Sequence, residues 1–228
     1  MDINQLDHTL TLLINGSDSI FWDNVMYTVT NTFSWSMVIV ALLVIIFKNN
    51  SIKNTLIILL TIALLIFVAD RICSGLVKPM VARWRPAQDP QLMYMVDVVR
   101  GYRGGRFGFF SGHACNTMCM AVFLSMLFRS AKVTLVLIFW SLTTTFTRLY
   151  LGVHYLGDVC VGWCVGIILG LLFYYLMRRF QRGDDRRSYI SEQFTSTGYL
   201  KSDMDSFLTI IFFNYVCVII FAMTLGIG

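Results

Sequence analysis

The sequence predicts an all-α integral membrane protein, a bundle of about six transmembrane helices preceded by an interfacial helical segment. Of its 228 residues, 57% are hydrophobic and only 14% are charged, whereas soluble domains carry about a quarter charged residues. The apolar residues also fall in continuous blocks, and a helix needs about 20 such residues to cross a bilayer. Without an internal repeat or a low-complexity segment, residues 1–228 are expected to form a single domain.

Six apolar blocks are long enough to be transmembrane helices. The first is the weakest, because Thr28, Thr30, Asn31 and Thr32 interrupt its start. The blocks span residues 27–47, 55–77, 111–128, 133–150, 155–177 and 206–225.

Residues 1–26 are expected to form short amphipathic helices at the membrane interface. Leu10, Phe21 and Trp22 stand among Asp and Asn residues, a mixture typical of interfacial helices, and Asn15-Gly16 is typical of a turn between them. The first residues lack the basic stretch with which a cleavable signal peptide begins.

The placement of Lys and Arg predicts the orientation in the membrane. Alternate threading of the spans puts two sets of cations on opposite faces, and the positive-inside rule makes the first face cytoplasmic. Several cations of the second set belong to motifs, so the motif face is expected outside the cytoplasm, toward the periplasm or exterior of a bacterial inner membrane. The first set is Lys48, Lys53, Arg129, Lys132, Arg178, Arg179, Arg182, Arg186, Arg187 and Lys201; the second is Lys78, Arg83, Arg85, Arg100, Arg103, Arg106 and Arg148.

Three short motifs stand at the ends of spans on that second face. Up-and-down threading brings them to one depth although they are far apart in the sequence. Ionisable residues at membrane depth are costly, so their convergence predicts a functional site. The motifs are Lys78 with Arg85-Pro86, Ser111-Gly112-His113, and Arg148 with His154 and Asp158.

The cations of these motifs suit a phosphate group. Arg85 and Arg148 carry planar guanidinium groups that can each bind two oxygens, and Lys78 adds a point charge. Ser111 and Gly112 stand where a helix N-terminus offers unpaired N–H groups to an anion. A single cation at a membrane edge is usually a snorkelling interfacial residue, but three cations beside two histidines favour a phosphate site.

The two motif histidines suit nucleophilic and acid–base chemistry. His154 and Asp158 are four residues apart, so a helix starting near residue 155 brings them to one face. A carboxylate bonded to one ring nitrogen leaves the other free to attack, and His113 could protonate a leaving alkoxide. His8 has no such neighbours and is interpreted as an interfacial surface residue.

The combined pattern Lys-x6-Arg-Pro, Ser-Gly-His and Arg-x5-His-x3-Asp resembles the type 2 phosphatidic acid phosphatase superfamily, with the catalytic core at residues 78–158. The resemblance implies that His154 is the nucleophile, oriented by Asp158, and that a phosphohistidine forms. It implies that His113 is the general acid and later the base for water. Lys78, Arg85, Ser111, Gly112 and Arg148 would hold the phosphate, without a metal or other cofactor.

Two positions depart from the usual form of the family. Phe110 replaces the common Pro before Ser-Gly-His, and Thr147 replaces the common Ser before Arg148. Neither removes a reacting group. The same motif set also serves soluble vanadium haloperoxidases, but the predicted spans argue against one here.

Other polar groups have open interpretations. Arg100, Arg103 and Arg106 either contact a second phosphate or a sugar phosphate, or form a solvated basic loop. Asp70 and Arg71 either pair with each other in a wet cavity or tune the site. Cys115 with Cys119 and Cys160 with Cys164 lie four apart on helices, and packing is favoured over metal ligation. The connection at 178–205 is expected to be a solvated cytoplasmic segment.

The sequence therefore predicts a membrane lipid phosphatase, with a lipid phosphate and the bilayer as its partners and no nucleic acid. The leading substrates are undecaprenyl diphosphate or a lipid A phosphate, because the Arg-Gly-rich loop at residues 100–106 suits a bulky external phosphate. The alternatives are a phosphatidate or phosphatidylglycerophosphate phosphatase and, in a different class, a non-catalytic anion transporter.

Overall fold

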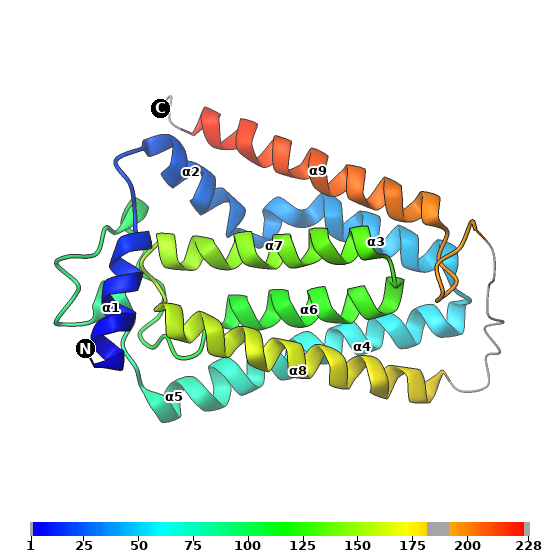
Figure 1. Ribbon diagram of the computed structural model, residues 1–228, viewed down its shortest axis with the longest axis horizontal. Helices are drawn as coiled ribbons and strands as arrows, with labels where there is room; N and C mark the ends of the chain where they lie inside the picture. The colour runs from blue at the N-terminus through cyan, green and yellow to red at the C-terminus, as the bar shows by residue number, and fades with distance from the viewer. Residues whose placement is uncertain (1, 182–191, 226–228) are drawn as a thin grey trace.

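The computed structural model describes residues 2–181 and 192–225 and shows a bundle of long helices lying side by side (Figure 1). The long helices are α3 (Ser36–Asn49), α4 (Ile52–Asp70), α6 (Gly112–Phe128), α7 (Ala131–Tyr150), α8 (Leu156–Phe180) and α9 (Lys201–Thr224). The shorter helices α1 (Ile3–Ile14), α2 (Ile20–Val29) and α5 (Lys78–Val81) lie toward one end. Within these described residues, five helical stretches are long and apolar enough to cross a membrane, and α6 is a shorter apolar helix. The predicted all-α membrane bundle is confirmed.

The first span starts later than predicted. A helix was expected from residue 27, but α2 ends at Val29 and the chain turns at Thr30 and Asn31. The Asn31 side chain accepts a hydrogen bond from the Phe33 N–H (3.0 Å) and caps the 3-10 turn Thr32–Trp35, which leads into α3. The same polar residues that weaken the apolar pattern therefore end one helix and start the next.

The second span is longer than predicted and contains an irregular turn. Helical structure is continuous over Ile52–Val81, with a π-helical stretch at Arg71–Val77 just before Lys78. Asp70 and Arg71 form the expected pair, 3.2 Å apart, on an exposed part of this helix. π-helical turns widen a helix locally and occur often at functional sites, which suits the position of Lys78.

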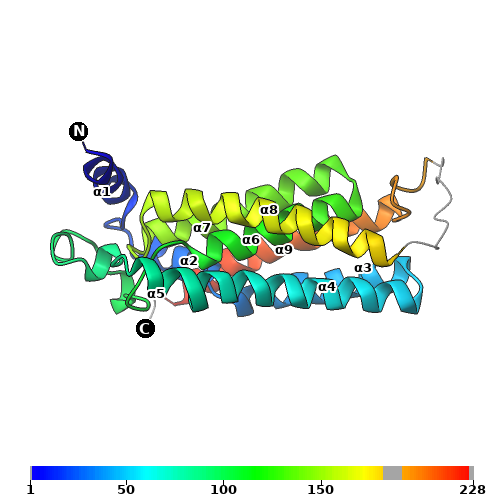
Figure 2. The same ribbon diagram turned by 90° about the horizontal axis from the view of Figure 1, so that it is seen from below.

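Helix α6 lies between α7 and α8 and packs against both, with α4 on another side (Figures 1 and 2). Three glycines at four-residue spacing on α8, Gly162, Gly166 and Gly170, face α6. A Cβ on any of them would lie 2.7 Å from a backbone oxygen of α6 or of its N-cap Ser111, so the two helices touch backbone to backbone. Cys115 and Cys119 are buried in this seam, as packing residues.

We expect Gly166→Ala to destabilise the protein by about 1–3 kcal/mol, because the added methyl meets the Cys115 carbonyl oxygen and the seam must open. Gly75→Ala is the matched control, since a Cβ there has nothing within 4 Å. Thermal unfolding of both variants in detergent measures the difference. Equal melting temperatures would contradict the close α6–α8 contact.

Alternate threading places the connections between α3 and α4 and between α6 and α7, the end of α8 and the start of α9 at one end of the bundle (Figure 1). Lys48 lies at that end and pairs with Asp203 of α9 at 2.6 Å. Helix α8 continues to Phe180 and α9 begins at Lys201, so the last connection is shorter than the 178–205 segment expected. Arg182, Arg186 and Arg187 of the predicted cytoplasmic set lie outside the described residues.

Candidate functional site

The candidate site lies at the opposite end of the bundle, where α5 ends, α6 begins, α7 ends and α8 begins (Figure 1). The three motifs occupy these helix ends, as alternate threading predicts. Helices α1 and α2, together with the connection between α5 and α6, cover this end of the bundle. The order of the spans therefore brings the motifs together. The helices that cover them, α1 and α2, carry none of the motifs.

His154 and Asp158 form the centre of the site. The His154 ring is buried, and its Nδ1 lies 3.4 Å from Asp158 Oδ2. On the other side of the ring, Nε2 lies 3.4 Å from Nη1 of Arg85. Asp158 also accepts the Tyr155 N–H at 3.1 Å, which fixes its carboxylate at the first turn of α8. The Asp158 carboxylate can therefore hold a proton on Nδ1 and leave Nε2 facing the cations.

A tight turn between α7 and α8 brings Arg148 and His154 to the same end of the bundle. Gly152 has φ = 64°, in the left-handed region that glycine adopts easily. The Val153 N–H bonds back to the Arg148 carbonyl at 3.1 Å, closing the turn between α7 and α8. Because this turn reverses the chain, only five residues need to separate Arg148 from His154.

Arg85 and Arg148 are both buried, with 7% and 2% of their surface exposed. Arg85 donates to the carbonyls of Phe107 and Val153, each at 3.2 Å. Arg148 donates to the Thr30 hydroxyl at 2.7 Å and to the hydroxyl of Tyr102 at 3.1 Å. Its Nε has no partner among the described residues. Neither guanidinium has a carboxylate partner in these contacts, so both keep positive charge available for an anion.

His113 and Lys78 complete the group. The charges of Arg148, Lys78 and Arg85 act on the His113 ring, which also lies within electrostatic range of His154. Lys78 is half-buried and follows the π-helical turn. His113 and Lys78 therefore lie near the two arginines and His154, at the same end of the bundle.

Ser111 and Gly112 open α6 in different ways. The Ser111 hydroxyl caps the helix by accepting the Ala114 N–H at 3.4 Å, and the Ser111 N–H donates to the Asp158 carbonyl at 3.0 Å. The Ser111 N–H therefore already has an acceptor. Of the backbone N–H groups predicted to bind an anion, those of Gly112 and His113 remain. Both stand in the first turn, where N–H groups have no carbonyl of their own helix to bind.

The electrostatics keep the nucleophile candidate neutral. Burial, followed by the positive charges of Arg85, Arg148 and Lys78, lowers the pKa of His154 well below its ordinary value of 6.5. Burial likewise lowers the pKa of Arg85, with Arg148 adding to the effect. Arg85, Arg148 and Lys78 outnumber the neighbouring Asp158 carboxylate, and such an excess of positive charge favours the binding of an anion.

Arg83 is a site residue that the motif interpretation missed. Its Nη1 lies 2.7 Å from Asp158 Oδ1, and its Nη2 lies 2.7 Å from Oδ2 of Asp7 on α1. Burial opposes its charge, but the carboxylates of Asp158 and Asp7 outweigh burial and raise the pKa of Arg83. Its guanidinium also lies 4.0 Å from the centre of the Tyr155 ring. The only signal in the sequence was its position two residues before Arg85.

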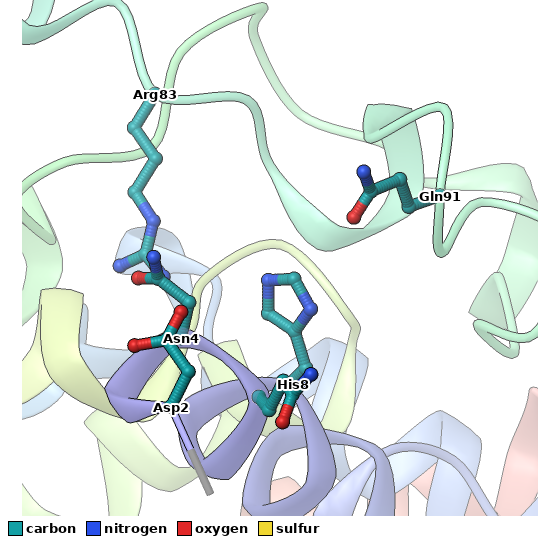
Figure 3. A pocket seen from close by; sticks show the side chains of 6 residues that line it. Asp2, Asn4, His8, Arg83 and Gln91 are labelled. Atoms are coloured by element: carbon teal, nitrogen blue, oxygen red, sulfur yellow. The ribbon is translucent and has the colours of Figure 1, made fainter.

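Figure 3 shows Arg83 extending from its loop toward α1, beside a polar hollow of about 460 Å³. The hollow is lined by Asp2, Asn4, Gln5, His8, Arg83 and Gln91. His8, interpreted from the sequence as a surface residue, borders this hollow and stacks on Tyr155 at 5.1 Å. Arg83 therefore separates this polar space from the buried Asp158 carboxylate.

Helix α1 also caps α8 directly. Asp7 Oδ1 accepts the Gly157 N–H at 2.8 Å, and the Thr11 hydroxyl accepts the Leu156 N–H at 3.1 Å. These are N–H groups of the first turn of α8, which have no carbonyl in their own helix. The N-terminal segment therefore belongs to the support of the site, although the sequence indicated only an interfacial helix.

The three arginines proposed for a second phosphate contact different parts of the chain. Arg103 donates to the Ala87 carbonyl at 2.6 Å, and Arg100 donates to the Leu225 carbonyl at 3.4 Å. Arg106 stacks over Trp84, 4.8 Å from the ring centre. These contacts favour the alternative of a solvated basic loop. Among the described residues, no group of three His, Cys, Asp or Glu side chains could hold a metal ion.

Comparison with known proteins agrees with this geometry. The family model of the PAP2 superfamily matches residues 54–182, which is more than half of the chain and includes every motif. The chain belongs to the PAP2 superfamily. It is therefore a membrane lipid phosphatase of the PAP2 type, as the motifs predicted.

Two curated relatives of this PAP2 protein are lipid A 4'-phosphatases. The protein from Bacteroides thetaiotaomicron is 38% identical over 178 residues, which is 78% of this chain and 79% of the relative. The protein from Porphyromonas gingivalis is 33% identical over 181 residues, 78% of this chain and 76% of the relative.

The fold of this PAP2 protein is also found in a solved structure. A transmembrane PAP2-type phosphatidylglycerolphosphate phosphatase from Bacillus subtilis superposes with a TM-score of 0.58 at 21% identity. The match covers 81% of this chain and 89% of the other. At this identity the match supports the arrangement of helices and not a substrate.

Proposed function

We propose that this chain removes a phosphate from a lipid A-type glycolipid phosphate through a phosphohistidine at His154. One observation carries the mechanism: the buried His154 ring lies between the Asp158 carboxylate and the Arg85 guanidinium, 3.4 Å from each. The substrate class is inferred from the two relatives that are named as lipid A 4'-phosphatases. Residues 78–158 would be the catalytic core.

The reaction would proceed in two displacements. In the first, His154 Nε2 attacks phosphorus, the bond from phosphorus to the lipid oxygen breaks, and His113 gives its proton to that oxygen. In the second, His113 takes a proton from water, whose oxygen attacks the phosphohistidine and releases inorganic phosphate. Asp158 would hold the Nδ1 proton throughout and stabilise the positive ring as the N–P bond forms.

The three cations would carry the charge of the transferring group. Arg85, Arg148 and Lys78 would bind its non-bridging oxygens, and electrostatic stabilisation of this kind is the main source of catalysis in phosphoryl transfer. These cations supply the charge that a divalent ion supplies in other phosphatases. We therefore expect full activity in the presence of EDTA.

We propose that the site faces the periplasm or the exterior of a bacterial inner membrane. Described cations of the predicted cytoplasmic set, such as Lys48, Arg129 and Lys201, stand at helix ends far from the motifs, which agrees with the positive-inside rule. A polar hollow beside Arg83 on the site end offers room for part of a large headgroup.

The proposal is tested by assaying the purified protein on four lipids side by side: lipid A, undecaprenyl diphosphate, phosphatidate and phosphatidylglycerophosphate. We expect the highest kcat/KM on lipid A. A higher value on undecaprenyl diphosphate or on a glycerophospholipid would reassign the substrate. Phosphate release from none of the four would overturn the proposed substrate class.

The lowered pKa of His154 has a direct kinetic consequence. A histidine with a lowered pKa stays neutral and nucleophilic as the pH falls through 6.5, so the acid limb of kcat/KM due to His154 lies below pH 6.5. Lys78→Gln removes one positive charge, so the limb moves to higher pH in that variant. Since both proteins act on the same substrate, its own ionisation cancels in the comparison. An unshifted limb would contradict the assignment.

A further inference from the structure

A largely apolar cavity of about 360 Å³ extends into the bundle from His113. Its walls come from α3, α4, α6, α7 and α9, and this volume is within the range of small-ligand sites. Along α6, His113, Asn116, Met120 and Leu124 follow one another at three- and four-residue spacing and so share one face. From His113 to Leu124 the helix rises about 16 Å, so the cavity is an elongated slot beneath the candidate site.

The exposure of two lining residues indicates that the cavity opens toward the lipid between α3 and α4. Two residues that line it, Ile39 on α3 and Ile66 on α4, are 45% and 40% exposed. In contrast, the lining residues on α9, Phe207 and Ile211, are almost fully buried. A hydrocarbon chain could therefore enter sideways from the bilayer and keep its headgroup at the membrane surface.

Three polar groups without hydrogen-bond partners lie in the wall of the slot, toward the end at which His113 stands. Asn116 Oδ1, Trp140 Nε1 and Thr144 Oγ1 have no hydrogen-bond partner among the described residues, and all three residues line the cavity. A buried polar atom left unpaired is costly, and more so where no water is available. The Asn116 side chain is only half-buried, and rotation of its amide can turn either the oxygen or the NH₂ toward an occupant.

We propose that this slot holds an acyl chain of the substrate and that the Asn116 amide hydrogen-bonds the ester or amide that joins this chain to the headgroup. The proposal rests on the proposed function, because it takes the phosphate to be bound at His113 and His154. Asn116 lies three residues deeper than His113, about 5 Å along the helix. A carbonyl a few bonds from a bound phosphate would reach this depth. A polyprenyl phosphate has hydrocarbon there and would leave the polar groups unpaired.

The slot therefore selects an acylated lipid phosphate over a purely hydrocarbon one. Discrimination of this kind is strong because the wrong ligand leaves a buried polar group without a partner. The apolar remainder of the slot, including Met120, Leu124 and Leu137, would bind the methylene groups of the chain.

The test compares phosphatidate with its dialkyl-ether analogue, which has the same phosphate and tails but no carbonyls. Each lipid is assayed as a competitor of p-nitrophenyl phosphate hydrolysis by the full-length protein in detergent, so that its affinity is measured whether or not it is hydrolysed. We expect the wild type to bind the ester roughly 5- to 10-fold more tightly than the ether. In Asn116→Leu the two lipids should bind equally, while p-nitrophenyl phosphate turnover is unchanged.

Two further variants test the binding of the acyl chain separately from the hydrogen bond of Asn116. Met120→Trp should fill the slot, so that long-chain phosphatidate binds more weakly while the affinity for a short-chain phosphatidate is unchanged. Met120→Leu is the matched control and should behave as the wild type does. Equal competition by ester and ether in the wild type, or an unchanged chain-length preference in Met120→Trp, would overturn the inference. Absence of p-nitrophenyl phosphate hydrolysis in the wild type would instead be a failure of the proposed function.

Discussion

Replacing His154 by alanine is expected to lower phosphate release by roughly 10⁴-fold or more, for every substrate, because the nucleophile itself is lost. His113→Ala should differ in a diagnostic way. If His113 protonates the leaving oxygen, its loss matters little for a leaving group that needs no proton. The His113→Ala protein should therefore still release p-nitrophenol in a rapid first turnover but form little phosphoprotein from lipids with alkoxide leaving groups. Steady-state turnover should fall on both substrates, because the base for the second displacement is lost.

Both variants are measured by initial rates of phosphate release and by the rate of leaving-group release in the first turnover, on a lipid and on p-nitrophenyl phosphate. Brief incubation with labelled p-nitrophenyl phosphate should also trap an alkali-stable, acid-labile phosphoprotein in the wild type and none in His154→Ala. Lipid hydrolysis by His154→Ala at the wild-type rate would refute the nucleophile assignment. Equal slowing of the first turnover on both substrates in His113→Ala would refute the general-acid assignment.

Arg83→Ala is expected to cost roughly 3 kcal/mol of stability and about 100-fold in kcat/KM, although we do not expect Arg83 to touch the phosphate. Its removal leaves the buried Asp158 carboxylate without the guanidinium 2.7 Å away, and an uncompensated buried charge is strongly destabilising. A carboxylate that shifts or takes up a proton no longer orients His154, and small displacements of a reacting group are costly in rate.

Arg106→Ala is the matched control, because Arg106 lies in the same connection, is exposed and stacks on Trp84 outside the site. Thermal unfolding and kcat/KM of both variants should be compared with those of Asp7→Asn. The Asp7 variant should show a smaller effect of the same kind, since it removes the charge that holds Arg83 to α1. An Arg83→Ala protein with wild-type kcat/KM would show that the ion pair supports the fold alone.

Much of the site could be predicted because each motif is local. The short turn between Arg148 and His154 and the spacing of His154 and Asp158 are fixed by bonds within about ten residues. The second span was correct in place because an apolar block has a length requirement set by the bilayer. The first span was misplaced at its start because a capping Asn31 is a local exception to an averaged apolar pattern.

The contributions of Arg83, Asp7 and Thr11 could not be predicted in the same way. Their partners, Asp158, Gly157 and Leu156, are 75 to 150 residues away in the chain. No periodicity or spacing links such positions. The same is true of Thr30, whose hydroxyl binds Arg148, and of the Asn116 amide in the wall of the cavity.

The sequence by itself determined the membrane bundle and the threading of its spans and supplied the candidates for the reacting groups, because hydropathy and helix ends are properties of short segments. Only the tertiary structure decided that α1 and Arg83 hold Asp158 in place, that Arg100, Arg103 and Arg106 turn to separate partners, and that a slot opens beneath His113. These features depend on which helix surfaces meet, and packing between distant segments is not encoded at any single position.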